Sequence, residues 1–189
     1  MAGGVAFGVY KFVEPVPNPL GSAEGRISLN AFVIITEDGV TLVSPKAGMG
    51  QGVHTTWAAL IAEELDVDWN DITVIHGPPA NAYYNSALFG MALPFKDYKV
   101  NDLQQAMREF AGNGAKLLSL QMTGGTTSMR DGFERMRLAG ATAREALKRV
   151  AANRTGFIPN ELETRQGTVI APDGTVLPYA ELAAAAAEI

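Results

Sequence analysis

In the first half of the chain, two short β-rich runs are followed by apolar residues at helical spacing, which predicts two strands and then a helix. Residues 32–36 and 40–44 are β-rich runs joined by Glu37-Asp38-Gly39, a turn sequence that predicts an antiparallel hairpin. After a glycine-rich turn at 48–52, apolar residues recur at helical spacing on one face. That face consists of Val53, Trp57, Leu60, Ile61 and Leu65. The polar run that follows ends the helix, and residues 72–75 predict a short strand.

One long amphipathic helix dominates the second half. Its apolar residues are spaced alternately by four and three positions, which predicts a single buried stripe. The stripe consists of Met129, Phe133, Met136, Gly140, Ala143, Leu147 and Val150. Two of these, Gly140 and Ala143, are small enough to let another backbone approach closely. The helix is expected to end within residues 153–156.

Shorter elements surround this helix. A helix is predicted over 101–110 from its Asn-Asp start, and the aromatic stretch 81–93 is expected to be an irregular loop on a surface that another element can cover. Residues 164–177 predict a second hairpin with a Pro-Asp-Gly turn, and an alanine-rich helix follows over 179–189. Because strands pair by hairpins and helices are grouped apart from them, the predicted class is α+β in two layers.

The first residues differ from the rest of the chain. Residues 2–10 are a short glycine-rich apolar run, well below the ~20 residues that a membrane-spanning helix needs. They fit either the end of a signal-peptide hydrophobic region or a poorly ordered N-terminus. A proline-rich segment at 14–19 follows. We therefore expect a tail over 1–29 and one domain over 30–189.

Composition excludes several classes of function. The net charge is −5 and no run of Lys or Arg occurs, which argues against nucleic acid as a partner. The absence of cysteine excludes disulfides, thiolate metal sites, iron–sulfur ligation and a cysteine nucleophile within this sequence. The 47% of hydrophobic and 19% of charged residues are those of an ordinary globular protein rather than a disordered one.

The first candidate binding segment is Gly48-Met49-Gly50-Gln51-Gly52 together with the helix start after it. A glycine-rich turn at a helix N-terminus exposes unpaired N–H groups, and the helix dipole adds partial positive charge there. Both features favour phosphate or another anion. The Gln51 amide suits the edge of a heterocycle, and Thr55 can cap the helix or bond a phosphate. A tight, capped turn without a ligand explains the same residues.

A second segment of this kind, Thr123-Gly124-Gly125-Thr126-Thr127-Ser128, precedes the long helix. The same physics applies, and an ordinary capped turn is again the alternative. If the two segments converge, they form a cradle for a ligand that carries phosphates and a ring system. Neither has the Gly-Lys-Ser/Thr of a P-loop or the glycine spacing of a Rossmann fingerprint.

Residues suited to catalysis or metal binding are scarce. His54 and His76 are far apart in sequence and have no cysteine beside them, so they are interpreted as a helix-start and a strand-end residue. Glu63, Glu64 and Asp66 suit a solvated helix face and its end. No Ser–His–Asp spacing or convincing general base is found, so neither a catalytic residue nor a metal ligand is predicted.

Two segments resemble the molybdopterin-binding large subunit of the xanthine oxidase and aldehyde oxidase family. The sequence GMGQGVHTTWAALIAEELDVDW is similar to its glycine–glutamine–glycine cofactor motif. The nearest branch is isoquinoline 1-oxidoreductase-like and includes membrane-associated bacterial aldehyde dehydrogenases. The sequence QMTGGTTSMRDGFERMRLAGATAREAL resembles the second cofactor loop and its helix. The likeness runs in order from about residue 30 to the C-terminus.

The resemblance implies a molybdenum-cofactor-binding-domain-like fold and a site for molybdopterin, in the cytosine dinucleotide form. It also implies hydroxylation of an aldehyde or N-heterocycle, with water as the oxygen source. By this resemblance the cofactor contacts fall on Gly50, Gln51, Gly52, Thr55, Thr123, Gly124, Gly125, Thr126, Thr127 and Ser128.

Partners are implied as well. These are the remainder of the large subunit, a [2Fe–2S] small subunit and, in this branch, a cytochrome c. Family large subunits are several times longer and carry an essential glutamate in a Gly-Glu-Pro-type segment, which this sequence lacks. We therefore expect the chain to supply one wall of the site and to be inactive alone.

Two alternative functions and a cellular location are also expected. The first alternative is a non-catalytic structural or interaction domain from a truncated or split large subunit, and the second is a stand-alone binder of another nucleotide. The apolar start also resembles the sequence after the twin-arginine pair of exported members. That likeness implies a periplasmic or envelope location, with membrane association, for the parent protein.

Overall fold

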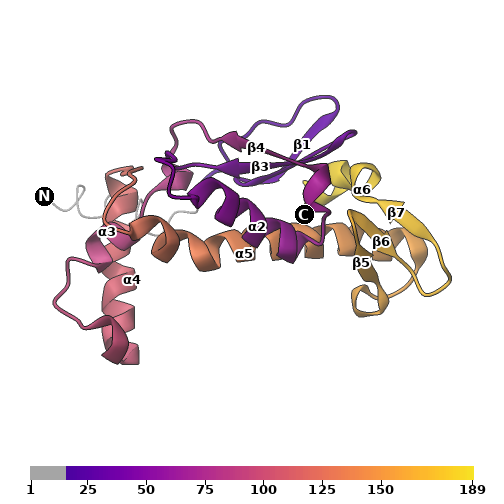
Figure 1. Cartoon of the computed structure of the whole chain (residues 1–189). Coiled ribbons are helices and arrows are strands. Elements are labelled where there is room, and N and C mark those ends of the chain that lie inside the picture. The colour runs from indigo at the N-terminus through magenta and orange to yellow at the C-terminus, as the bar shows by residue number, and fades with distance from the viewer. Residues whose placement is uncertain (1–15) are drawn as a thin grey trace, which may run out of the picture.

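The computed structural model describes residues 16–189, so the apolar run predicted as a signal remnant or tail lies outside the described residues. A four-stranded sheet packs on long helices, with a helical group at one end and a small sheet at the other (Figure 1). The mixture of segregated helices and sheets confirms the α+β class. Within residues 16–189, no helix combines the length and apolar character needed to cross a bilayer.

The larger sheet has the order β1-β2-β3-β4. Its strands are β1 (Arg26–Asn30), β2 (Val33–Thr36), β3 (Gly39–Ser44) and β4 (Ile72–His76). The predicted hairpin of β2 and β3 is confirmed, with Thr36 opposite Gly39. Gly39 has φ 142°, and a Cβ there would stand 2.5 Å from the Asp71 carbonyl oxygen, so the turn requires glycine.

Two features of this sheet differ from the expectation. β3 and β4 pair in parallel rather than as a hairpin, because the helix α2 (Val53–Leu65) lies between them and carries the chain back across the sheet. β1 was not predicted and takes residues from the expected tail over 1–29. Its sequence does alternate, since Ile27 and Leu29 stand between polar residues, but this short run lies inside the segment that was expected to be a tail.

Helix α2 packs along the long helix α5 (Thr127–Thr155), as Figure 1 shows. The two run parallel: Trp57 meets Gly132, and Ile61 meets Gly140. Further along, the Arg144 guanidinium donates to the Glu64 carbonyl oxygen at 2.8 Å. The predicted close approach at Gly140 is confirmed, since a Cβ there would stand 2.5 Å from the Ile61 carbonyl oxygen.

The predicted stripe on α5 is confirmed from Met136 onward, Met129 packs partly buried against the core, and the prediction is wrong at Phe133. Phe133 is 48% exposed, and the buried residues near the start are Ser128, Asp131 and Gly132. The reason is the indole of Trp57, which lies where a side chain on Gly132 would project. Only a small residue fits there, so the buried face turns away from Phe133.

The helical group at the start of α5 contains α3 (Ala87–Gly90), α4 (Asp102–Leu117) and two 3-10 turns, η2 (Asn81–Tyr83) and η3 (Asp97–Lys99). The predicted helix start at Asn101 is confirmed, although α4 extends further than expected. The stretch 81–93 is not simply a surface loop. Tyr83 is fully buried and donates its hydroxyl proton to the Ala31 carbonyl oxygen at 2.7 Å.

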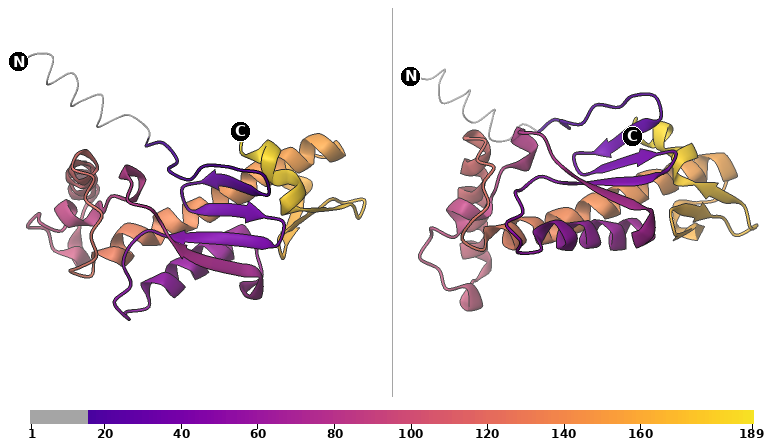
Figure 2. Two further views of the ribbon diagram at one scale, coloured as in Figure 1. Left: turned by 90° about the horizontal axis from the view of Figure 1, so that it is seen from above. Right: turned by 45° about the horizontal axis from the view of Figure 1, so that its top comes forward.

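The other end holds the second sheet, seen beside α6 in both views of Figure 2. A turn at Gln166-Gly167, with φ 46° and 75°, divides the expected hairpin into three strands. The remaining elements are η1 (Trp69–Asp71), η4 (Pro159–Glu161), β5 (Glu163–Arg165), β6 (Thr168–Ile170), β7 (Val176–Pro178) and α6 (Tyr179–Ala186).

Candidate functional site

The N-termini of α2 and α5 lie side by side. Trp57 and Gly132, which touch, come five residues after the N-cap Gly52 and six residues after the N-cap Thr126. Because a helix rises about 1.5 Å per residue, two parallel helices in this register begin almost level. The positive ends of both dipoles therefore fall at the same end of the molecule.

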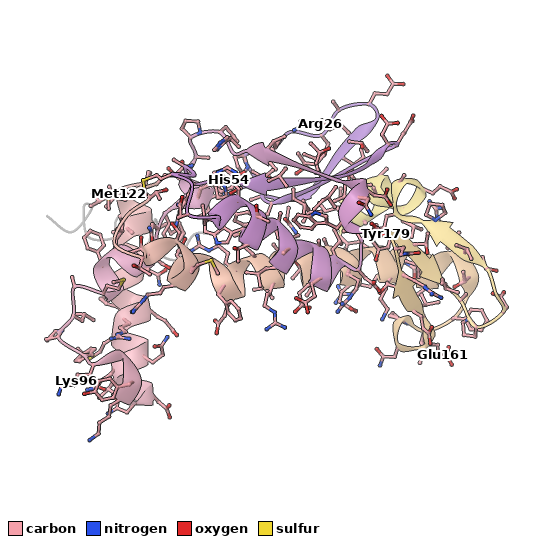
Figure 3. All side chains as sticks on the ribbon, viewed as in Figure 1. Arg26, His54, Lys96, Met122, Glu161 and Tyr179 are labelled. Atoms are coloured by element: carbon pink, nitrogen blue, oxygen red, sulfur yellow. The ribbon has the colours of Figure 1, made fainter. Side chains whose placement is uncertain are left out.

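The two glycine loops are joined directly. The Thr123 hydroxyl donates to the Ala47 carbonyl oxygen at 3.1 Å, and the Gln121 amide donates to the Pro45 carbonyl oxygen. In Figure 3, His54 and Met122 lie at one end of the molecule, far from Tyr179 and Glu161. The structure thus brings together the two segments that the sequence singled out.

Neither helix start is capped by a side chain from the described residues, and neither has an acidic residue in its first turn. Helix α4 provides a contrast. Its Asn101 and Gln104 form a reciprocal capping box, and Asp102 occupies its first turn. The two glycine loops therefore leave positive helix ends without the usual local compensation.

The first loop is exposed and depends on glycine. Gly50 and Gly52 have φ 86° and 80°, which disfavours a side chain at either position. The Gln51 side chain folds back on its own loop, where its oxygen accepts from the Met49 N–H and its nitrogen lies 3.5 Å from the Ala47 carbonyl oxygen. Thr55 is exposed on the first turn of α2.

The second loop has two kinds of residue. Gly125 and Thr126 are exposed, and both have φ 58°. Thr127 is buried, and its hydroxyl donates to the Gly124 carbonyl oxygen at 2.6 Å and accepts from the Asn85 amide at 2.7 Å. Ser128 is also buried. The hydroxyl of Thr127 therefore shapes the loop, while Gly125 and Thr126 lie at its surface.

An ion pair that the sequence did not predict lies beneath the loops. Lys46 and Asp131 are buried and bonded to each other, with only 1% of each side chain exposed. Burial lowers the pKa of Lys46, and the charge of Asp131 acts against that shift. The available signal was a charged residue in the second turn of a helix, but position 131 is not part of the predicted apolar stripe.

The two histidines also come together. Their ring centroids are 4.3 Å apart, and His54 Nε2 lies 3.0 Å from the Lys46 carbonyl oxygen. A Cβ on Gly48 would stand 2.8 Å from the His54 ring, so this glycine lets the loop close over the imidazole. Among the side chains that the structure describes, no three from His, Asp or Glu gather closely enough to hold a metal ion.

A cavity of about 750 Å³ opens beside the joined loops. Its walls are residues 45–47, 76–77, 79–81 and 119–123, so it begins where the first loop leaves β3 and ends at Thr123. Most polar groups here bond to one another: the Gln121 side-chain oxygen, for example, accepts from the Ala80 N–H at 3.3 Å. The two uncapped helix starts beside this cavity are suited to an anionic ligand.

Comparison with known proteins adds independent information. Residues 2–90 match the model of the molybdopterin cofactor-binding domain. The chain is 28% identical over 145 residues to the beta subunit of isoquinoline 1-oxidoreductase from Brevundimonas diminuta, covering 76% of this chain and 15% of that protein. It is 26% identical over 183 residues to the B subunit of nicotinate dehydrogenase from Pseudomonas putida, covering 93% and 12% respectively.

Solved structures include a more distant likeness. The CO dehydrogenase of Oligotropha carboxidovorans aligns with 18% identity and a TM-score of 0.46, over 76% of this chain and 14% of that one. The chain spans only 15% and 12% of the length of the two curated relatives.

Proposed function

We propose that this chain is part of a molybdenum-binding subunit of the xanthine oxidase family, and that it holds the phosphates of a molybdopterin cofactor between the N-termini of α2 and α5. The supporting observation is the pair of level, parallel and uncapped helix starts. Parallel dipoles side by side repel each other, and an anion placed at their shared positive end relieves that repulsion.

The residues fit such a group. Loop residues Gly50, Gly52 and Gly125 keep the backbone free of side chains, so phosphate oxygens can approach their N–H groups. Thr55 and Thr126 are exposed hydroxyls at the two helix starts. Gln51 turns its amide from its own loop toward the pterin edge, and Thr127 holds the second loop in shape.

The molybdenum centre, when bound, supplies the redox chemistry of hydroxylation with water as the oxygen source. This chain's part is to bind and orient the cofactor. The catalytic glutamate, the electron acceptors and most of the substrate pocket belong to the remainder of the large subunit, a [2Fe–2S] subunit and a cytochrome c. The substrates are aldehydes or N-heterocycles, and the chain is inactive alone.

The cytosine dinucleotide form suits this site for a physical reason. A dinucleotide carries one more phosphate than the simple pterin cofactor, and two helix starts offer two anion positions. The cavity bounded by residues 119–123 gives a nearby volume of about 750 Å³ for the second ring system.

A negative charge placed at one helix start tests this function. Thr126→Asp adds a carboxylate where the cofactor phosphate is proposed to sit, and aspartate tolerates the left-handed conformation at this position. Ala180→Asp is the matched control, because it adds the same charge to the first turn of α6. Each variant is produced with its partner subunits in a host that makes the cofactor, and bound molybdenum and pterin are quantified.

We expect Thr126→Asp to reduce the molybdenum content about tenfold, which corresponds to about 1.4 kcal/mol of lost binding. The same variant of the chain alone should be slightly more stable, because its carboxylate caps the dipole. Equal molybdenum content in Thr126→Asp, Ala180→Asp and the unmodified chain would refute the proposed site.

A role in assembly is a second candidate, favoured by α4. Leu103, Met107 and Leu117 recur at helical spacing, with 71%, 46% and 47% of their surface exposed. We propose that the remainder of the large subunit covers this face. Leu103→Lys with Met107→Lys should leave the stability of the chain unchanged and prevent its co-purification with that remainder, and retained co-purification would exclude this face.

A further inference from the structure

We propose that Lys46 and Asp131 form a buried clamp that fixes the two glycine loops in their binding arrangement before any cofactor arrives. This inference rests on the proposed function, because it assigns positioning residues to the same site. Neither side chain is proposed to touch the cofactor.

The position of the pair in the chain supports this role. Lys46 lies two residues before Gly48, where the first loop leaves β3, and Asp131 lies three residues after Ser128, in the second turn of α5. The ion pair thus joins the base of one loop to the base of the other across 85 residues of sequence. The Thr123–Ala47 hydrogen bond joins the same loops near the surface.

Asp131 is held by several donors at once. Besides Lys46, its carboxylate accepts from the Ser86 N–H at 2.8 Å and the Ser86 hydroxyl at 2.7 Å, and the Arg135 guanidinium lies 3.3 Å away. A buried carboxylate with this many partners has one favourable position. The clamp therefore also fixes the segment that precedes α3.

Lys46 is fixed from two directions. Its backbone carbonyl oxygen contacts His54 Nε2 at 3.0 Å, and its ammonium group lies 5.3 Å from the centre of the Trp57 ring. Lys46 and Arg135 carry two positive charges against the single negative charge of Asp131. The network beneath the loops is therefore one charge positive in sum, which favours an anion above it.

A buried ion pair is a poor means of stabilising a fold, because desolvation offsets most of the attraction. Apolar residues of similar size often serve stability as well or better. A pair that defines geometry behaves differently, because its hydrogen bonds have direction and apolar contacts do not. Replacing the pair by apolar residues should therefore preserve stability in either case, but it should loosen the loops only if the pair has a positioning role.

The test replaces the whole pair. Lys46→Met with Asp131→Leu leaves no buried charge unpaired, so the variant should fold with near-native stability. Asp131→Asn is a second variant that keeps the shape of the side chain. The control is Arg137→Met with Glu64→Gln, which removes a more exposed ion pair that also joins α2 to α5.

Hydrogen exchange of the chain alone is the first measurement. We expect the double variant to exchange amide protons about tenfold faster in both loops, 48–52 and 123–128, with no change in residues 163–178 of the far sheet. The control should leave both loops unchanged. Unaltered loop exchange in the double variant would overturn the clamp.

Molybdenum and pterin content of the assembled enzyme is the second measurement. With the clamp removed, we expect a loss of about tenfold at near-native stability, and full cofactor content would overturn the proposal. The two proposals fail separately. Absence of cofactor from the assembled enzyme that contains the unmodified chain would refute the proposed function, whereas the exchange experiment tests the clamp without any cofactor.

Discussion

Gly132 of α5 lies directly against the indole ring of Trp57, so that a Cβ at this position would overlap the ring. Substitution by alanine normally stabilises a helix by up to about 1 kcal/mol relative to glycine. Here Gly132→Ala must push a fully buried indole away, and overpacking of this kind costs about 1–3 kcal/mol. We expect a net destabilisation of about 1–2 kcal/mol in urea unfolding.

A glycine in α4 gives the matched comparison. A Cβ on Gly114 would stand 3.5 Å from the Phe89 ring, which is an ordinary contact. Gly114→Ala should therefore stabilise the chain by a few tenths to about 1 kcal/mol. If both substitutions change stability in the same direction, the close approach at Gly132 does not govern helix packing.

Because the starts of α4 and α5 are capped differently, replacing Asn101 or Thr126 by alanine should reduce folding stability by different amounts. Asn101→Ala destroys the capping box of α4 and should cost about 1 kcal/mol of stability. Thr126 makes no capping bond with its side chain, so Thr126→Ala should lose far less on that account. Thermal unfolding of both variants decides the matter, and an equal loss would mean that Thr126 has a capping role.

The buried hydroxyl of Tyr83 makes the folding stability of the chain depend on pH in the alkaline range. Burial raises its pKa to about 12, compared with about 10 in the unfolded chain. Below pH 10 the hydroxyl is protonated in both states, so its contribution is complete. Between pH 10 and about pH 12 only the unfolded state releases the proton, and stability falls as pH rises.

Tyr83→Phe should remove this part of the pH dependence. It also leaves the Ala31 carbonyl oxygen without its donor, which costs about 1–2 kcal/mol at neutral pH. The midpoint of thermal unfolding, followed from pH 8 to 11.5 in both proteins, should fall less steeply in the variant. Parallel curves would show that Tyr83 does not titrate differently in the folded state.

Gln51 offers a test of binding that is separate from folding. Its side chain is exposed and bonds only within its own loop among the described residues. Gln51→Ala should therefore change the unfolding free energy by less than about 0.5 kcal/mol while lowering the molybdenum content of the assembled enzyme. Gly125→Val should lower the molybdenum content more strongly, and it should also destabilise the chain, because valine resists φ 58°. Normal molybdenum in both variants would remove these residues from the site.

The elements predicted most reliably from sequence are those whose pattern is local. The β2–β3 turn, the face of α2 and the stripe from Met136 to Val150 each follow from residues close in sequence. The parallel pairing of β3 with β4 could not be predicted in this way, because it depends on where α2 returns the chain. β1 was missed because its alternation, Ile27 and Leu29, is short and lies in the segment that was expected to be a tail.

In the candidate site too, the residues with a local sequence pattern were predicted and those that depend on distant contacts were not. Glycines and hydroxyls before two helices marked both loops, and their likeness to known cofactor motifs supported the assignment. Lys46 and Asp131 escaped notice because their partnership spans 85 residues and depends on the rotation of α5 about its axis. That rotation is set by the Trp57 indole, which no pattern within residues 127–155 records.

Gly132 and Gly140 act as two notches on α5, one filled by an indole and the other by a main-chain carbonyl. To slide one helix past the other by a turn, about 5.4 Å, both notches would have to be vacated together. The pair of helices therefore resists shear and moves as one rigid unit. Any hinge in this molecule must lie beyond it, in the connections on either side.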